Sequence, residues 1–285
     1  MIGSPALRSG SDRPAPLAAL AAAITDMLVV TWRNLVHIRR EPEQLLDVTV
    51  QPVLFTLLFV AVFGTGIAIP GGGSYADFAI AGLLMLNLTT SSMGTAVGLA
   101  TDLEKGMMDR FRILPMWMPG VLIGRSLADV LSSALCTVIV VVTGLFVGWR
   151  PGPEATLGGI IGGFALALLF AYACSWAAAC AGMLARGAES AQVFGFLVLF
   201  PLSFVSNALV PTNHMVGWLQ TFTDWNPVSA VTAAIRTLQD SPNPSAGLQA
   251  WPMQHPVWAA LGWSVALLAI FMPVASHLFR RRTTD

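Results

Sequence analysis

Long apolar runs alternate with short polar segments along most of this chain of 285 residues. About 20 helical residues, each advancing ~1.5 Å, cross a hydrocarbon core of about 30 Å. Six runs reach that length, near residues 48–69, 78–101, 121–148, 157–184, 190–211 and 256–279. The pattern therefore predicts an all-α integral membrane protein with six transmembrane helices.

Two further segments precede the first span. Residues 1–16 are rich in Ser, Gly, Pro and Arg, which is typical of a disordered lead. In residues 17–40 apolar side chains recur at helical spacing, which predicts an amphipathic helix lying in the cytoplasmic interface. A signal peptide is the alternative, since Arg13 precedes an apolar run, but Asp26 counts against it. Residues 41–285 would then form the membrane domain.

A second large hydrophilic region, residues 212–256, separates the fifth and sixth expected spans. We refer to it as the outer segment. It contains Trp218, Trp225 and Trp251, and tryptophan is enriched at the level of the lipid headgroups. Residues 228–238 suit a helix, whereas residues 241–247 read as an unstructured loop. We expect short extracellular interfacial or re-entrant helices here.

Composition agrees with the membrane class. Hydrophobic residues make up 55% of the chain and charged residues 11%, too few to cover a soluble protein of this length. The formal net charge is zero, so nothing indicates nucleic-acid binding. The three cysteines lie inside apolar runs and the four histidines are scattered, which argues against a disulfide framework and against a metal site.

The distribution of Lys and Arg sets the expected orientation, because these residues are enriched in cytoplasmic loops. With the N-terminus inside, only Arg150 and Arg236 of the 15 Lys and Arg residues fall outside. We therefore expect a multi-pass protein of the cytoplasmic (inner) membrane with both termini in the cytoplasm.

Charge concentrates between the second and third expected spans. Residues 102–119, here named the charged segment, contain Asp102, Glu104, Lys105, Asp109, Arg110 and Arg112, in a chain that has few charges elsewhere. The segment falls on the cytoplasmic side, and we interpret it as a docking surface.

Arg125 and Asp129 lie just beyond the charged segment, four residues apart on one helix face. No other Asp, Glu, Lys or Arg falls inside the expected spans. We expect them to form a paired structural anchor at the cytoplasmic entrance, and a proton relay is the alternative.

A stripe of small and polar residues runs along one side of the second expected span. Asn87, Thr90, Ser91 and Thr95 recur at spacings of three and four. Close helix packing explains such a stripe, and the functional interpretation is a wall of the substrate path. In the fifth span Ser203, Ser206 and Asn207 are further candidates for that path. The glycines at 158, 159, 162 and 163 offer two overlapping Gly-x-x-x-Gly faces for helix packing.

No catalytic residues are predicted. The sequence has no Gly-x-x-x-x-Gly-Lys-Ser/Thr phosphate loop, no His-Glu-x-x-His and no carboxylate pair inside a span. The chain is therefore expected to bind no cofactor of its own. An ion-coupled carrier usually keeps ionisable groups near the midplane of the membrane, and these spans lack them.

Two blocks of residues resemble a known family. Asp109-Arg-Phe-Arg-Ile-Leu-Pro115 together with Gly124-Arg-Ser-Leu-Ala-Asp129 is similar to the ABC-2 type permeases of the daunorubicin-resistance kind, and the similarity extends over residues 30–280. The resemblance implies a six-span permease that pairs with a second permease subunit, identical or different. It also implies partner ATP-binding cassette subunits, which would hold ATP and Mg on the cytoplasmic face.

In that family the N-terminal interfacial helix and the loop between spans two and three transmit nucleotide-driven closure. Carried over, the coupling residues are Asp102, Glu104, Lys105, Gly106, Asp109, Arg110, Arg112, Leu114 and Pro115. The expected function is export of a hydrophobic or amphiphilic substrate, either a drug-like compound or a cell-envelope lipid. The alternative is a secondary carrier or channel driven by an ion gradient.

Overall fold

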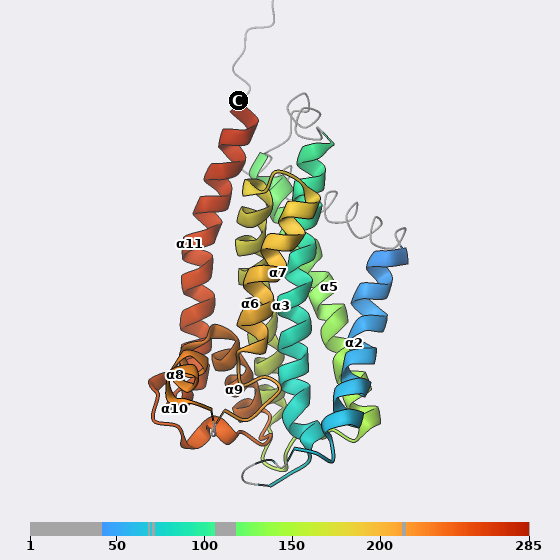
Figure 1. Cartoon of the computed structure of the whole chain (residues 1–285), viewed down its shortest axis with the longest axis vertical. Helices are drawn as coiled ribbons and strands as arrows, with labels where there is room; N and C mark the ends of the chain where they lie inside the picture. The colour runs from blue at the N-terminus through green and yellow to red at the C-terminus, as the bar shows by residue number, and fades with distance from the viewer. Residues whose placement is uncertain (1–41, 68, 70–71, 106–117, 213–214, 285) are drawn as a thin grey trace, which may run out of the picture.

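The computed structural model describes residues 42–67, 69, 72–105, 118–212 and 215–284, and these form a bundle of long helices (Figure 1). The long helices are α2 (Pro42–Phe63), α3 (Tyr75–Glu104), α5 (Met118–Val147), α6 (Leu157–Leu184), α7 (Ala188–Phe204) and α11 (Pro256–Thr284). Each expected span therefore falls on a helix. The expected lead and interfacial helix, residues 1–40, lie outside the described residues.

Four of these helices contain stretches long and apolar enough to cross a membrane, by length and composition alone: Tyr75–Glu104, Arg125–Val147, Leu157–Leu184 and Pro256–Arg281. The apolar parts of α2 and α7, Thr49–Phe63 and Ala188–Phe204, are shorter. The expected boundaries of both were too long. Residues 205–211 leave the helical path after Phe204, where the side chain of Asn226 in the outer segment donates to the carbonyls of Leu202 and Val205.

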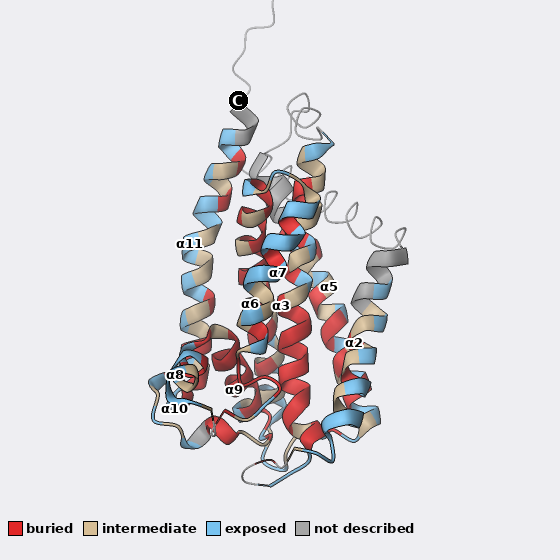
Figure 2. Cartoon of the chain, viewed as in Figure 1, coloured by how far each residue is buried: buried red, intermediate tan, exposed pale blue. Residues whose placement is uncertain are grey.

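Helix α3 is the centre of the bundle and packs against α2, α5, α6 and α7. Its first half is buried on every side (Figure 2). Glycines allow two close approaches: a Cβ at Gly82 would collide with the carbonyl oxygen of Ala208, and one at Gly182 of α6 would press against the carbonyl oxygen of Ala96. These contacts bring backbone against backbone on both sides of α3.

The outer segment folds into short elements at the end of the bundle where α3 begins (Figure 1). They are α8 (Gly217–Trp225), α9 (Pro227–Leu238), the 3₁₀ turn η1 (Pro244–Gly247) and α10 (Trp251–Gln254). Short helices form in this segment, whereas the loop expected over residues 241–247 is partly wrong, since η1 forms within it. Trp218 and Trp225 remain exposed, at 75% and 53%.

Helix α9 is enclosed by the bundle rather than resting on it. All its residues from 228 to 236 are buried, and it packs against α3, α6 and α11. Only one of the two expected glycine faces makes this contact. Gly159 lies against the carbonyl of Leu238 and Gly163 against Ile235, whereas Gly158 faces open space.

Candidate functional site

The charged residues next to the charged segment join α3 to α5. Arg125 Nη1 forms a salt bridge with Asp102 Oδ2 at 2.6 Å, and the two side chains are 21% and 29% exposed. The guanidinium lies over Gly98, where any Cβ would collide with it. The last turn of α3 and the early part of α5 are therefore fixed to each other at the base of the charged segment.

One turn further into the bundle, a second polar contact joins the same helices. Thr95 Oγ1 donates a hydrogen bond of 2.8 Å to Asp129 Oδ2. Arg125 and Asp129 were expected to pair along α5. The salt bridge described for Arg125, however, is made to Asp102 of α3. The two residues thus anchor one helix to another rather than brace a single helix.

Glu104 brings a third helix to this end of the bundle. Its carboxylate lies where a Cβ of Gly187 would be, at the start of α7. Negative charge is favourable at a helix N-terminus, because the backbone N–H groups there have no helical partner. Ser190 Oγ accepts hydrogen bonds from the N–H groups of Arg186 and Gly187 in the same turn. Two helices, α5 and α7, therefore meet α3 beside the charged segment.

Lys105 is the one other predicted coupling residue that the structure describes. Glu104 and Lys105 are exposed at the end of α3. Gly106, Asp109, Arg110, Arg112, Leu114 and Pro115 lie outside the described residues.

The polar side chains of the stripe on α3 mostly donate hydrogen bonds to backbone carbonyls of the same helix. Asn87 Nδ2 donates to the carbonyl of Leu83 at 2.8 Å, and Thr90 Oγ1 donates to the carbonyl of Leu86 at 2.8 Å. Asn87 is buried, Thr90 is half-buried and Ser91 is exposed. Of the four candidates for the substrate path on this helix, Ser91 is the accessible one.

The three candidates after Pro201 lie in a joint between α7 and the outer segment. Ser203, Ser206 and Asn207 are all buried. Ser206 Oγ donates to the carbonyl of Ser203, and Asn207 Nδ2 donates to Ser245 Oγ at 3.0 Å. The N–H of Asn207 donates to Ser229 Oγ at 3.0 Å. The bonds of Asn207 thus tie the end of α7 to α9 and η1.

Asn226 closes the same joint from the other side. Its Nδ2 donates to the carbonyls of Leu202 and Val205, at 2.7 and 2.6 Å, and its Oδ1 accepts from the N–H of Val228 at 2.8 Å. One amide side chain therefore satisfies orphan carbonyls at the end of α7 and an orphan donor at the start of α9. The following Pro227 suits the first position of a helix.

Arg236 is the residue that sequence reasoning missed. It is fully buried, and its guanidinium lies 3.8 Å from the centre of the Phe78 ring. Nε and Nη2 donate to the carbonyl of Phe78, Nη2 also to that of Ala208, and Nη1 to that of Asn207, at 2.9 to 3.1 Å. We name this arrangement the Arg236 cage. The signal in the sequence was a lone arginine in an apolar helix, counted only as an outer charge.

Comparison with known proteins gives a consistent result. The ABC-2 type transporter family matches residues 25–239. A daunorubicin resistance ABC transporter permease protein from Streptomyces coeruleorubidus is 32% identical over 274 residues, which is 96% of this chain and 91% of that protein. A protein from Mycobacterium tuberculosis named "probable doxorubicin resistance ABC transporter permease protein" is 24% identical over 92% of this chain and 90% of its own length.

Proposed function

Because the chain belongs to the ABC-2 type transporter family, the membrane permeases of ABC transporters, we propose that it exports a hydrophobic or amphiphilic substrate outward across the cytoplasmic membrane. Energy would come from ATP hydrolysed on a separate ATP-binding cassette subunit, where ATP and Mg bind. The substrate is a drug-like compound or a cell-envelope lipid. The names of both relatives, which refer to anthracycline resistance, support the drug-like class.

The proposed topology has six spans, with α2 and α7 as the short ones and both termini in the cytoplasm. The outer segment then faces the outside, and α9 forms the re-entrant helix that caps the bundle. Burial of α9 among α3, α6 and α11 supports this arrangement, as does the exposure of Trp218 and Trp225 beside it. The membrane lipids would contact the exposed apolar faces of α2 and α7.

The observation that carries the proposal is the salt bridge between Asp102 and Arg125. It joins the end of α3 to the early part of α5, the two helices between which the charged segment runs. A force applied to that segment by a docked ATPase would therefore act on α3 and α5 together. Glu104 extends the same connection to α7. A second permease subunit, identical or different, would complete the transporter, and closure would be a population shift driven by nucleotide binding on the partner.

The coupling proposal is tested with the permease and its ATPase reconstituted together in liposomes. Reversing three charges of the segment at once, as E104K, D109K and R110E, should abolish the stimulation of ATP hydrolysis while membrane insertion is unchanged. The control is E154K, since Glu154 is an exposed acid in the loop between α5 and α6, at the opposite end of the bundle. Normal transport by the triple variant would contradict the docking role of the segment.

The energy source is tested separately. The purified permease alone should hydrolyse no ATP, because its sequence has no phosphate loop. Transport of a lipophilic dye should stop when ATP is depleted. Transport that persists without ATP and stops with an uncoupler would instead support an ion-driven carrier.

A further inference from the structure

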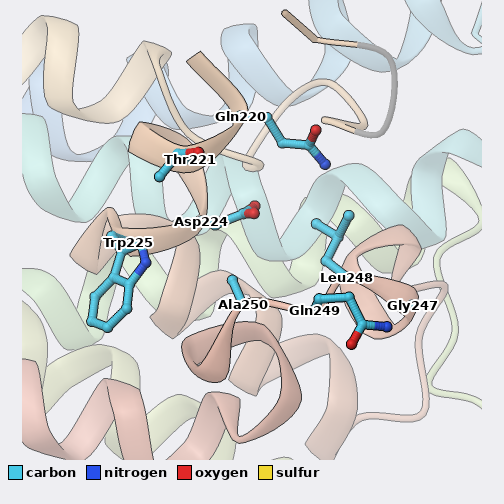
Figure 3. A pocket seen from close by; sticks show the side chains of 8 residues that line it. All are labelled: Gln220, Thr221, Asp224, Trp225, Gly247, Leu248, Gln249 and Ala250. Carbon is cyan, nitrogen blue, oxygen red and sulfur yellow. The ribbon is translucent and has the colours of Figure 1, made fainter. Parts of the chain in front are cut away.

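A pocket lies in the outer segment between α8 and the chain leading into α10 (Figure 3). Its volume is about 380 Å³, enough for a small organic group. The described residues that line it come from two stretches of chain: Gln220, Thr221, Asp224 and Trp225 from α8, and Gly247, Leu248, Gln249 and Ala250 from the approach to α10. None of these side chains takes part in the contacts at the charged segment or in the Arg236 cage.

Asp224 is the unusual member of this lining. It is only 7% exposed, and no hydrogen bond or ion pair of its carboxylate is found among the residues that the structure describes. Figure 3 shows the carboxylate projecting into the space between Gln220, Leu248 and Ala250. Burial raises the pKa of the Asp224 carboxyl, because desolvation penalises its charged form. An unpaired buried carboxylate is costly to keep, so its presence in a pocket points to a ligand.

The rest of the lining narrows the kind of ligand. Among the described lining residues none is basic, so Asp224 sets the sign of the local field. Trp225 lines one side, and an aromatic ring attracts cations through its face. Gln220 and Gln249 offer amide oxygens as hydrogen-bond acceptors. Within the described residues no group of three or more His, Cys, Asp or Glu side chains is assembled for a metal ion. These features favour an organic cation over an inorganic one.

We propose that the pocket between α8 and α10 binds an organic ammonium group, with Asp224 as the counter-ion and Trp225 as an aromatic wall. On the proposed topology the pocket opens on the outer side of the membrane, and only this location rests on the proposed function. The ammonium group can belong to a lipid headgroup at the interface or to an exported amphiphile. The recognising chemistry is the same for both.

The binding test uses the full chain in nanodiscs of phosphatidylglycerol, a lipid without an amine. Radiolabelled choline should bind saturably in equilibrium dialysis. Unlabelled choline should displace it, whereas its uncharged isostere 3,3-dimethyl-1-butanol should not. Competition by the isostere equal to that by choline would overturn the proposal, because the site would then recognise shape without charge.

Two variants test the assigned residues. Asp224→Asn keeps the shape of the side chain and removes its charge, and it should weaken choline binding at least about fivefold. Ala250→Phe should block binding by filling the pocket without altering the carboxylate. The matched control is Glu154→Gln, which removes an exposed acid outside the pocket and should leave binding unchanged. Choline binding to Asp224→Asn or Ala250→Phe at wild-type strength would refute the site.

A last arm separates the two sources of the ammonium group. Adding phosphatidylcholine to the nanodisc should reduce the binding of free choline if a lipid headgroup occupies the pocket. Undiminished binding assigns the pocket to a soluble or exported amphiphile. Every measurement is made without an ATPase, so a failure here leaves the proposed transport function intact, and a failed coupling experiment leaves this site intact.

Discussion

Replacing Arg236 by methionine should loosen the outer end of the bundle. The substitution keeps much of the side-chain length and removes the guanidinium from the Arg236 cage. Four hydrogen bonds and the contact with the Phe78 ring are lost together. The acceptors belong to α3 and to the chain after α7, so a single side chain now holds α9 to both.

The expected loss of stability is estimated from the backbone carbonyls that Arg236→Met leaves without a hydrogen-bond donor. Asn207 and Ala208 contribute two carbonyls that accept from Arg236 and have no other described hydrogen bond. An unpaired buried acceptor costs about 1–3 kcal/mol, so the two cost roughly 2–6 kcal/mol. Relief of the desolvated guanidinium offsets part of this. We expect a net loss of about 2–4 kcal/mol, or a fall in Tm of roughly 4–16 °C at the ~2–4 °C per kcal/mol typical of larger domains.

The assay is the midpoint of thermal unfolding in detergent. The protein is heated to a series of temperatures, and the fraction that still elutes as a monodisperse peak in size-exclusion chromatography is measured at each one. Arg236→Lys should fall between wild type and Arg236→Met, because lysine keeps the charge and loses the planar fork of donors. Arg150→Met is the matched control. Arg150 also donates to two backbone carbonyls, but it is exposed, so its loss should change stability by no more than ~0.5 kcal/mol. A melting point for Arg236→Met equal to that of the control would refute the reasoning.

Two further predictions concern the packing of α3. In a double-mutant cycle, Asp102→Asn and Arg125→Gln should show a coupling of about 1–2 kcal/mol in thermal stability, between the values of exposed and buried pairs, and strict additivity would contradict the salt bridge. Gly82→Ala should prevent the accumulation of folded protein in membranes, because its Cβ would collide with the carbonyl of Ala208. Gly158→Ala meets open space and should accumulate normally, and equal yields of the two variants would show that the close approach is unimportant.

The sequence predicted the helices well because lipid imposes a length and a composition on each span. It placed the end of α7 wrongly for a reason that no apolar pattern can supply. Residues 205–211 are mostly apolar apart from Ser206 and Asn207, yet the helix stops at Phe204, and Asn226 of the outer segment binds the carbonyls of Leu202 and Val205. Tertiary hydrogen bonds decided this boundary. Local hydropathy does not encode them.

For the candidate residues too, the sequence indicated the type of side chain but not its partners in the folded protein. Ser203, Ser206 and Asn207 were selected because hydroxyl and amide groups in a span suit a polar path, but the same groups also suit a joint. The partners of Asn207 lie in α9 and η1, which the spacing of residues in the fifth span could not indicate, whereas Ser206 bonds to the nearby backbone. For Arg125 and Asp129, the i, i+4 spacing placed both side chains on one face of α5. The partners Asp102 and Thr95 come from another helix, so only the packing of α3 on α5 could reveal them.

The two ends of α3 are held by contacts of different strength. At its first turns, the Phe78 carbonyl accepts from a fully buried guanidinium, whereas at its last turn Asp102 meets Arg125 in a pair that is partly exposed to solvent. A partly exposed ion pair is weaker, since water and salt screen it. The helix has 30 residues, or roughly 45 Å of length, and its hydroxyls back-bond to the helix near the middle, which favours bending there. A force on the charged segment should therefore displace the Asp102 end first, while the Arg236 cage keeps the outer end in place.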